Sequence, residues 1–297
     1  ANAADLVEEV YGGMASVEDN TGAVDHNTAN MKNGTTHLLY GGYTFGKGAV
    51  TNNKVQFDGG TSTGYVAGGY LDNTASTVEM TGNKVVFTNG TAAELAGADS
   101  NGKGKLSGNT VDFGGAASTA EILRGALAEN EAAVEGNGVT MTAGTAESVY
   151  GGATYMTDPS NNLVGGNGRA EKNTVAVTGG TVQAHIYGAK AAGSADRNVG
   201  CRADGNIVTI TGGTIGTTMQ AANVYGGKTT EGPGSGTTDN VMNLGAEDGT
   251  YAADLTNAQV HGDNSTDSAV NNNVLNVHGK DITVKSVDNF DKYNFKL

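Results

Sequence analysis

Short runs of alternating apolar and polar residues recur along the chain, and each run begins at an Asn and ends in a turn of small or polar residues. In NTVAVTGGT from Asn173, Val175 and Val177 lie two residues apart, which is the period of a half-buried strand. Val, Ile, Thr and Phe are common at these positions and suit a pleated surface, whereas so many Gly residues would destabilise a helix. The runs therefore predict strands, and their copies start at Asn27, Asn53, Asn83, Asn109, Asn137, Asn173, Asn206, Asn240 and Asn273.

A second apolar phrase follows several of these runs and ends in two small residues. Examples are LLYGG ending at Gly42, YVAGG at Gly69 and VYGG at Gly152. Successive Asn residues lie 26 to 36 positions apart, and a repeat near thirty residues is typical of solenoids. Equivalent strands stacked in register predict an all-β fold, a right-handed parallel β-helix of about nine coils with loop insertions. The side chains expected to point into its core are Val55, Phe57, Val85, Phe87, Val111, Phe113, Val175, Val177, Val208 and Ile210.

Residues at equivalent positions of successive coils stack above one another and form columns along such a fold. Stacked Asn side chains can form amide ladders along a rod, so we expect a structural role for the Asn column. The second phrase supplies a Tyr column, for which two interpretations exist: an aromatic strip that binds glycans, or packing at a tight corner. The small neighbours of each Tyr favour packing. The Tyr column comprises Tyr11, Tyr40, Tyr150, Tyr187 and Tyr225.

Three insertions lengthen the coils, at residues 153–172, 190–205 and 228–239. Loops on a rigid scaffold commonly carry recognition, and we expect the first two insertions to project from the rod without joining its strands. The single cysteine, Cys201, lies in the second insertion beside Arg202, which predicts a thiol pKa slightly below the usual range.

Residues 118–135 contain the only helix-like stretch, STAEILRGALAENEAAVE. Ser118 and Glu121 fit a capping box, while Ile122 and Leu123 occupy the slot of the second strand. We therefore expect a strand first and a short turn of helix from about Ala126.

The composition of the chain limits the classes of partner that it can bind. The chain of 297 residues has a formal net charge of −14, with 17 Lys and Arg that never cluster. Nucleic acid and anionic membrane surfaces are therefore excluded as expected partners. No apolar run approaches the 18 residues of a spanning helix, so we expect no membrane insertion of this segment.

The sequence contains no recognisable set of catalytic residues. The five His are scattered over different repeat slots, and no metal-binding or phosphate-binding motif is present. Enzymatic β-helices that cleave polysaccharides place two carboxylates close together on one face, whereas Asp58 and Asp112 occupy different slots two coils apart. We therefore predict no enzyme activity, and no catalytic, cofactor-binding or metal-binding residues.

The repeated N-x-V-x-V-T-G-G-T followed by V-Y-G-G resembles the passenger domains of bacterial autotransporters, the adhesins of type V secretion. The final segment, NNNVLNVHGKDITVKSVDNFDKYNFKL, resembles the part that precedes the outer-membrane barrel in such proteins. The resemblance implies a secreted, extracellular chain at the bacterial cell surface, a role in adhesion or aggregation, and folding from the C-terminal coils. Its partner would be a host or bacterial surface protein or glycan, with self-association as a further expectation. Residues 1–270 then form the β-helical repeat region and 271–297 the C-terminal coils that seed folding, with Phe290, Tyr293 and Phe295.

Two other functions remain open at this point. One is a β-helical carbohydrate-active enzyme, a polysaccharide lyase or hydrolase, which carboxylates meeting on one face would favour. The other is a structural subunit whose coil ends stack into a filament, which uncapped apolar end coils would favour because exposed strand edges invite further pairing.

Overall fold

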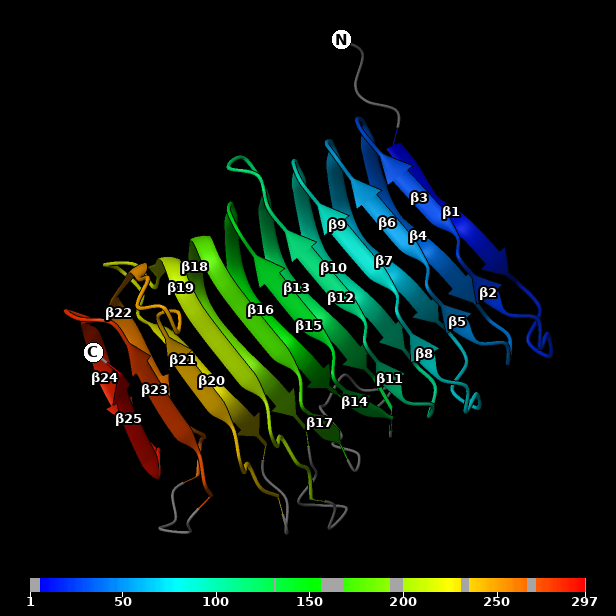
Figure 1. Ribbon diagram of the computed structural model, residues 1–297. Helices are drawn as coiled ribbons and strands as arrows, with labels where there is room; N and C mark the ends of the chain where they lie inside the picture. The colour runs from blue at the N-terminus through cyan, green and yellow to red at the C-terminus, as the bar shows by residue number, and fades with distance from the viewer. Residues whose placement is uncertain are drawn as a thin grey trace.

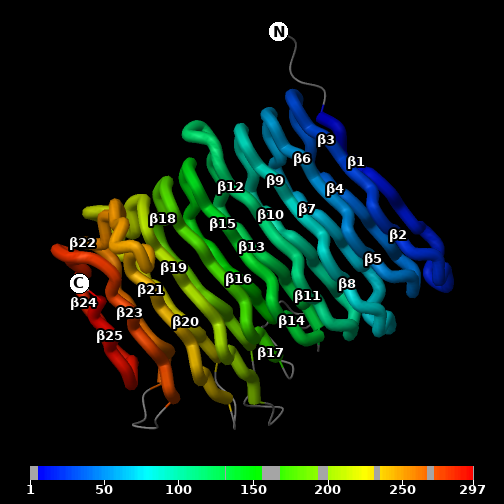
Figure 2. Tube along the Cα trace, viewed as in Figure 1, coloured from blue at the N-terminus to red at the C-terminus, as the bar shows by residue number. Residues whose placement is uncertain are grey.

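The computed structural model describes residues 6–130, 132–155, 168–192, 200–230, 235–265 and 271–296. These residues form one stack of parallel strands that runs from β1 at one end to β24 and β25 at the other (Figure 1). Figure 2 shows the same order as successive coils from the blue N-terminal end to the red C-terminal end. No helix occurs in the described residues. The predicted all-β parallel β-helix is confirmed.

Each coil between residues 24 and 191 uses three kinds of strand, and the described coils that follow lack a short strand. The second coil, for example, consists of the short strand β5 (Val50–Thr51), the four-residue strand β6 (Lys54–Phe57) and the long strand β7 (Thr61–Leu71). Each strand pairs in parallel with its equivalent in the next coil, so that Val55 lies beside Val85.

The remaining strands repeat this plan. The other short strands are β2 (Val24–Asp25), β8 (Met80–Thr81), β11 (Leu106–Ser107), β14 (Ala133–Glu135) and β17 (Arg169–Glu171). The other strands of the four-residue class are β3 (Thr28–Met31), β9 (Lys84–Phe87), β12 (Thr110–Phe113), β15 (Gly138–Met141), β21 (Val241–Leu244), β23 (Val274–His278) and β25 (Lys292–Lys296). The other long-class strands are β1 (Leu6–Ala15), β4 (Thr35–Thr44), β10 (Thr91–Ser100), β13 (Thr119–Ala128), β16 (Thr145–Thr154), β20 (Ala222–Thr229), β22 (Ala252–His261) and β24 (Val284–Asp288). Two strands, β18 (Thr174–Ala191) and β19 (Ile207–Ile215), continue through the turn between the two classes.

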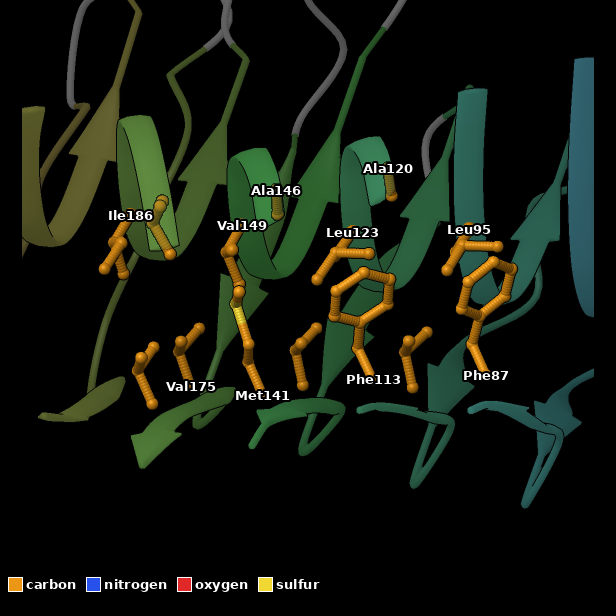
Figure 3. Packing of buried hydrophobic residues seen from close by; sticks show 14 of the residues in the cluster. Phe87, Leu95, Phe113, Ala120, Leu123, Met141, Ala146, Val149, Val175 and Ile186 are labelled. Atoms are coloured by element: carbon orange, nitrogen blue, oxygen red, sulfur yellow. The ribbon is translucent and has the colours of Figure 1, made fainter. Parts of the chain in front are cut away.

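Two separate hydrophobic cores run along the rod. The first lies between the four-residue strands and the first half of the long strands, where Phe87 and Leu95 point toward each other (Figure 3). The Phe57 and Phe87 rings stack with centroids 4.4 Å apart. The second core lies behind the short strands and includes Met80 and Leu106. All ten side chains that the sequence predicts to point inward are buried in the first core, which confirms that prediction.

A ladder of Asn side chains separates the two cores. The backbone N–H and the Nδ2 of Asn53 both donate to Asn83 Oδ1, each at 3.1 Å, and the same Nδ2 donates to the Val24 carbonyl at 2.8 Å. This arrangement satisfies backbone groups that the turn leaves without a strand partner. It confirms the structural role predicted for the Asn column. The ladder runs through Asn27, Asn53, Asn83, Asn109, Asn137, Asn173, Asn206, Asn240 and Asn273.

Carboxylates accept the hydrogen bonds at the last Asn. The backbone N–H of Asn273 donates to Asp291 at 3.0 Å, and its Nδ2 donates to Asp263 at 2.7 Å. Every earlier Asn donates toward the C-terminal end of the rod, so the last position requires an acceptor and no donor. An ionised carboxylate meets that requirement.

The paired small residues of each long strand lie opposite the Asn ladder. A Cβ atom added to Gly42 would lie 2.5 Å from Asn53 Cγ, and one added to Gly41 would lie 2.5 Å from the Gly68 carbonyl oxygen. Consecutive residues of a flat strand point to opposite faces, whereas both of these face the interior. The long strand is therefore kinked at this pair, and its outer face is concave there.

The predicted turn of helix from Ala126 is wrong. Strand β13 continues to Ala128, with Ala126 and Ala128 in the second core and Leu127 on the outer face. This alternation is the period of a strand, so pairing with the neighbouring coils overrides the helix propensity of Ala and Leu. The Ser118 hydroxyl donates to the Gly114 carbonyl and does not cap a helix.

The expectation that the first two insertions stay apart from the strands is wrong at their described edges. Arg169–Glu171 forms β17 in the short-strand sheet, and Arg202 forms bridges to Arg169 and Gly236. The middle of each of these two insertions, residues 156–167 and 193–199, lies outside the described residues.

The cysteine is also placed differently from the prediction. Cys201 lies fully buried in the second core, with its Sγ 3.4 Å from the Ala191 carbonyl oxygen. Burial raises the pKa of the Cys201 thiol, so the predicted lowering is wrong.

Residues 271–296 continue the same ladders with β23, β24 and β25. Tyr293 and Phe295 continue the core columns beside Leu275 and Val277, but they are 46% and 66% exposed at the open end of the stack. The role of this segment as a folding seed stays a prediction.

We predict that Asn137→Ala lowers the free energy of unfolding by about 3–6 kcal/mol, because it leaves the Asn109 donors and the Leu106 carbonyl without partners. The matched control is Asn276→Ala in a half-exposed amide ladder, where water can replace the lost bonds to Asn243 and Asn294, and the expected loss is below about 1 kcal/mol. Chemical denaturation measures both. Equal losses for the two variants would contradict the structural importance of the buried ladder.

Candidate functional site

The concave outer face of the long strands holds most of the Tyr residues of the chain. We call the outward surface of β1, β4, β7, β10, β13, β16, β18 and β20, on both sides of the kink, the outer groove. Tyr150, Tyr187 and Tyr225 stack along it with ring centroids 4.9 and 5.5 Å apart, and His261 continues the column at 4.5 Å. The Tyr40 and Tyr43 rings meet across the kink at 5.4 Å.

The packing predicted for the Tyr column is therefore confirmed, since these rings lie against one another in the groove. Tyr40, Tyr150 and Tyr187 are buried although they point away from both cores. Concavity explains this burial, because rings on either side of the kink cover each other.

The Tyr column is interrupted in three consecutive coils. Register places Ala67, Ala96 and Arg124 between Tyr40 and Tyr150. The same coils carry a cavity of about 370 Å³, which we call the acidic cavity. Its lining residues are His37, Leu38, Tyr40, Gly64, Tyr65, Tyr70, Ala93, Glu94, Asp99, Leu127 and Glu129.

Buried polar atoms without partners lie in and beside this cavity. Asp99 is 3% exposed, and its Oδ1 makes no hydrogen bond within the described residues. Arg124 is 5% exposed; its Nη1 pairs with Glu94, while its Nε has no partner in the same part of the chain. The buried Tyr65 hydroxyl also lacks a hydrogen bond of normal geometry there. Such groups are rare in folded proteins because each one is destabilising.

The local electrostatics follow from this burial. Burial raises the pKa of Asp99 well above its usual range, and the neighbouring Glu129 carboxylate raises it further. Burial likewise raises the pKa of Glu129. For Arg124, burial alone would lower the pKa, but Tyr155 and Glu94 more than offset this and raise it, so the guanidinium stays charged. The cavity therefore holds two carboxyl groups that ionise reluctantly.

The C-terminal half of the outer groove has the opposite charge. Lys228 Nζ lies 4.7 Å from the Tyr225 ring centroid and 5.7 Å from that of Tyr187. Lys190 Nζ lies over Tyr155 and Tyr187 at 5.5 and 5.9 Å. Burial lowers the pKa of Lys228. The rings of this half are thus occupied by cations of the chain itself.

The acidic residues weighed from the sequence lie elsewhere. Asp58 accepts hydrogen bonds from Gln56 and Thr88, and Asp112 pairs with Lys84 at 2.5 Å, both beside the four-residue strands. The His are equally dispersed, and no group of three or more His, Cys, Asp or Glu side chains in the described ranges could hold a metal ion.

Sequence reasoning missed Glu94, Asp99, Arg124 and Glu129. The available signal was a departure from the repeat: ELAGAD and ILRGAL place an acid and a base in slots that hold Tyr in other coils.

Comparison with protein-family models, curated proteins and solved structures finds no match. No helix long and apolar enough to cross a membrane occurs in the part of the chain that the structure describes.

We predict that Asp99→Asn stabilises the rod at high pH and not at low pH. Because the folded-state pKa of Asp99 is raised, the native state binds this proton more tightly than the unfolded state, and stability falls as pH rises from below the ordinary carboxyl pKa through the raised one. Asn cannot ionise. We expect the melting temperature of the variant to exceed that of the wild type by about 3 °C at pH 8, with the difference disappearing near pH 4.

The control for this experiment is Asp112→Asn, which changes an exposed carboxylate paired with Lys84. It should give no stabilisation that grows with pH. A wild-type advantage at pH 8 over Asp99→Asn would contradict the account of Asp99.

Proposed function

We propose that this chain is the rod of an extracellular surface adhesin, and that it binds its partner through the outer groove. The observation that carries the proposal is the groove itself: a concave strip of Tyr rings with unpaired buried polar groups, held on a stack of paired strands. Tyr rings combine a large apolar surface with a hydroxyl and are common in recognition surfaces. The resemblance to autotransporter passengers supports the same role, with a surface protein or glycan as the partner.

The division of charge along the groove supports specific recognition. Asp99 and Glu129 lie in one half, and Lys190 and Lys228 lie in the other. A partner with matching charges would bind in one register and one direction, because complementary charges favour one alignment and like charges oppose the others. The formal net charge of −14 speaks against nucleic acid as that partner.

One observation favours a second candidate, a β-helical enzyme acting on polysaccharides. Glu94 and Asp99 on β10 and Glu129 directly after β13 come from adjacent coils on the same face, which is the arrangement such enzymes use. A carboxyl group with a raised pKa can act as a general acid. Turnover of a polysaccharide that disappears in both Asp99→Asn and Glu129→Gln would establish this function in place of adhesion.

We predict that a double variant, Tyr225→Ala with Lys228→Ala, weakens binding to the partner at least tenfold. It removes a ring and a cation from the half of the groove where both are partly exposed. The measurement is binding of the purified rod to epithelial and bacterial cells and to arrays of surface glycans and proteins.

The matched control carries two substitutions outside the groove, Thr28→Ala on β3 and Thr140→Ala on β15, where both side chains are exposed. It should bind as the wild type does. Binding that is equal in all three proteins, or no binding to any cell or array, would overturn the proposed function.

A further inference from the structure

Two carboxyl groups of the acidic cavity, those of Asp99 and Glu129, are not paired with a Lys or Arg in the part of the chain that the structure describes. Glu94 pairs with Arg124, and Asp72, which lies outside the lining of this cavity, accepts hydrogen bonds from Asn101 at 2.8 Å and Tyr43 at 3.2 Å. Asp99 and Glu129 form no ion pair within the described residues. A buried carboxylate without a partner is strongly unfavourable, so a positive charge entering this cavity would be stabilised.

Three aromatic rings line the same cavity. The centroids of Tyr40 and Tyr70 lie 5.1 Å apart, those of Tyr65 and Tyr70 lie 6.2 Å apart, and those of Tyr40 and Tyr65 lie 6.5 Å apart. The rings are tilted or edge-on to one another. The electron-rich faces of such rings attract cations, more strongly where water is excluded.

The other half of the groove shows how this surface accommodates cations. Lys190 and Lys228 in that half, and Arg124 beside the acidic cavity, each lie within 6 Å of the centroids of two Tyr rings. In the acidic cavity the rings and the carboxylates are present, but no Lys or Arg of the described chain lies over Tyr40, Tyr65 or Tyr70. The acidic cavity therefore offers aromatic rings and carboxyl groups to a cation that the described chain itself does not supply.

We propose that the acidic cavity binds an alkylammonium group, with the ammonium beside Asp99 Oδ1 and the alkyl chain against Tyr40, Tyr65 and Tyr70. The group belongs to a Lys side chain of a partner protein or to a free diamine, which share this chemistry. The inference rests on the proposed adhesin function only for the source of the ammonium group. A neutral sugar is disfavoured because it would leave the buried carboxyl groups uncompensated.

The test is isothermal titration calorimetry of the whole chain with n-pentylammonium, and with pentan-1-ol as the neutral compound of similar shape. We expect saturable binding of the ammonium, at least tenfold tighter than that of the alcohol. Asp99→Asn and, separately, Glu129→Gln should each weaken ammonium binding at least tenfold, whereas Asp112→Asn at the surface should leave it unchanged. Equal affinities for ammonium and alcohol, no saturable ammonium binding, or full affinity in both cavity variants would overturn the proposal.

A separate control tests the three rings of the cavity, Tyr40, Tyr65 and Tyr70. Tyr70→Phe keeps the ring face and should retain the affinity within about twofold, whereas Tyr70→Leu should lose at least fivefold. Equal affinities of these two variants would contradict a role for the ring.

Competition against n-pentylammonium separates the two sources. Tighter binding of cadaverine indicates a free diamine, and tighter binding of a Lys-containing peptide indicates a protein partner; either result supports the cavity assignment. Failure of both compounds to displace n-pentylammonium would contradict it. A rod that binds ammonium but no cell or array refutes adhesion alone, and a rod that adheres but binds no ammonium refutes this inference alone.

Discussion

The hydrogen bonds between Asn side chains at the centre of each coil are the interaction on which the rest of the structure depends. Asn53 and Asn83, for example, each donate from Nδ2 to a backbone carbonyl of the preceding coil, Val24 or Val50, and also donate from Nδ2 and the backbone N–H to the Oδ1 of the next Asn. This polar column cannot be displaced sideways into either core without losing several buried hydrogen bonds at once. It therefore fixes both the register of the coils and the division of the interior into two cores.

The ladder also determines the shape of the outer face. Because the amides fill the centre of the coil, the strand opposite must approach them closely, and only very small residues fit at Gly41 and Gly42. With both residues facing inward, the strand bends and its outer face becomes concave. Tyr rings on the two sides of the bend then cover one another, and the acidic cavity lies in the coils where the Tyr column is interrupted. The acidic cavity is thus a local departure from a constraint that acts along the whole rod.

Much of the fold could be predicted from the sequence. The two-residue alternation around Val175 and the recurrence of Asn fixed the strands, the inward side chains and the amide ladder in advance, because all three depend only on local period and on the repeat. The prediction of a helical turn at Ala126 was wrong because it relied on local helix propensity, whereas pairing with strands of the neighbouring coils determines the conformation there. The predicted lowering of the Cys201 thiol pKa was wrong because the neighbouring residues in the sequence do not show that Cys201 lies in the second core.

The candidate site was less accessible to prediction. Asp99, Arg124 and Glu129 are separated in sequence by irregular spacings, and only the register of the stacked strands brings them together. Tyr65 and Tyr70 lie on one strand, β7, but belong to different columns, and both line the acidic cavity. A residue that departs from the repeat, such as Arg124 at a position that holds Tyr in other coils, indicates which coil is unusual. It does not reveal which side chains of the neighbouring coils lie beside it.

The most direct test of the account is hydrogen exchange of the backbone amides along the Asn column, measured by NMR. Asn83, Asn109 and Asn137 each donate their backbone N–H to the side chain of the next coil and lie fully or almost fully buried. We expect these amides to exchange only through global unfolding and to be as protected as the amide of Val111 in the adjacent core strand. Rapid exchange of the three Asn amides beside a protected Val111 would contradict the central role of the ladder.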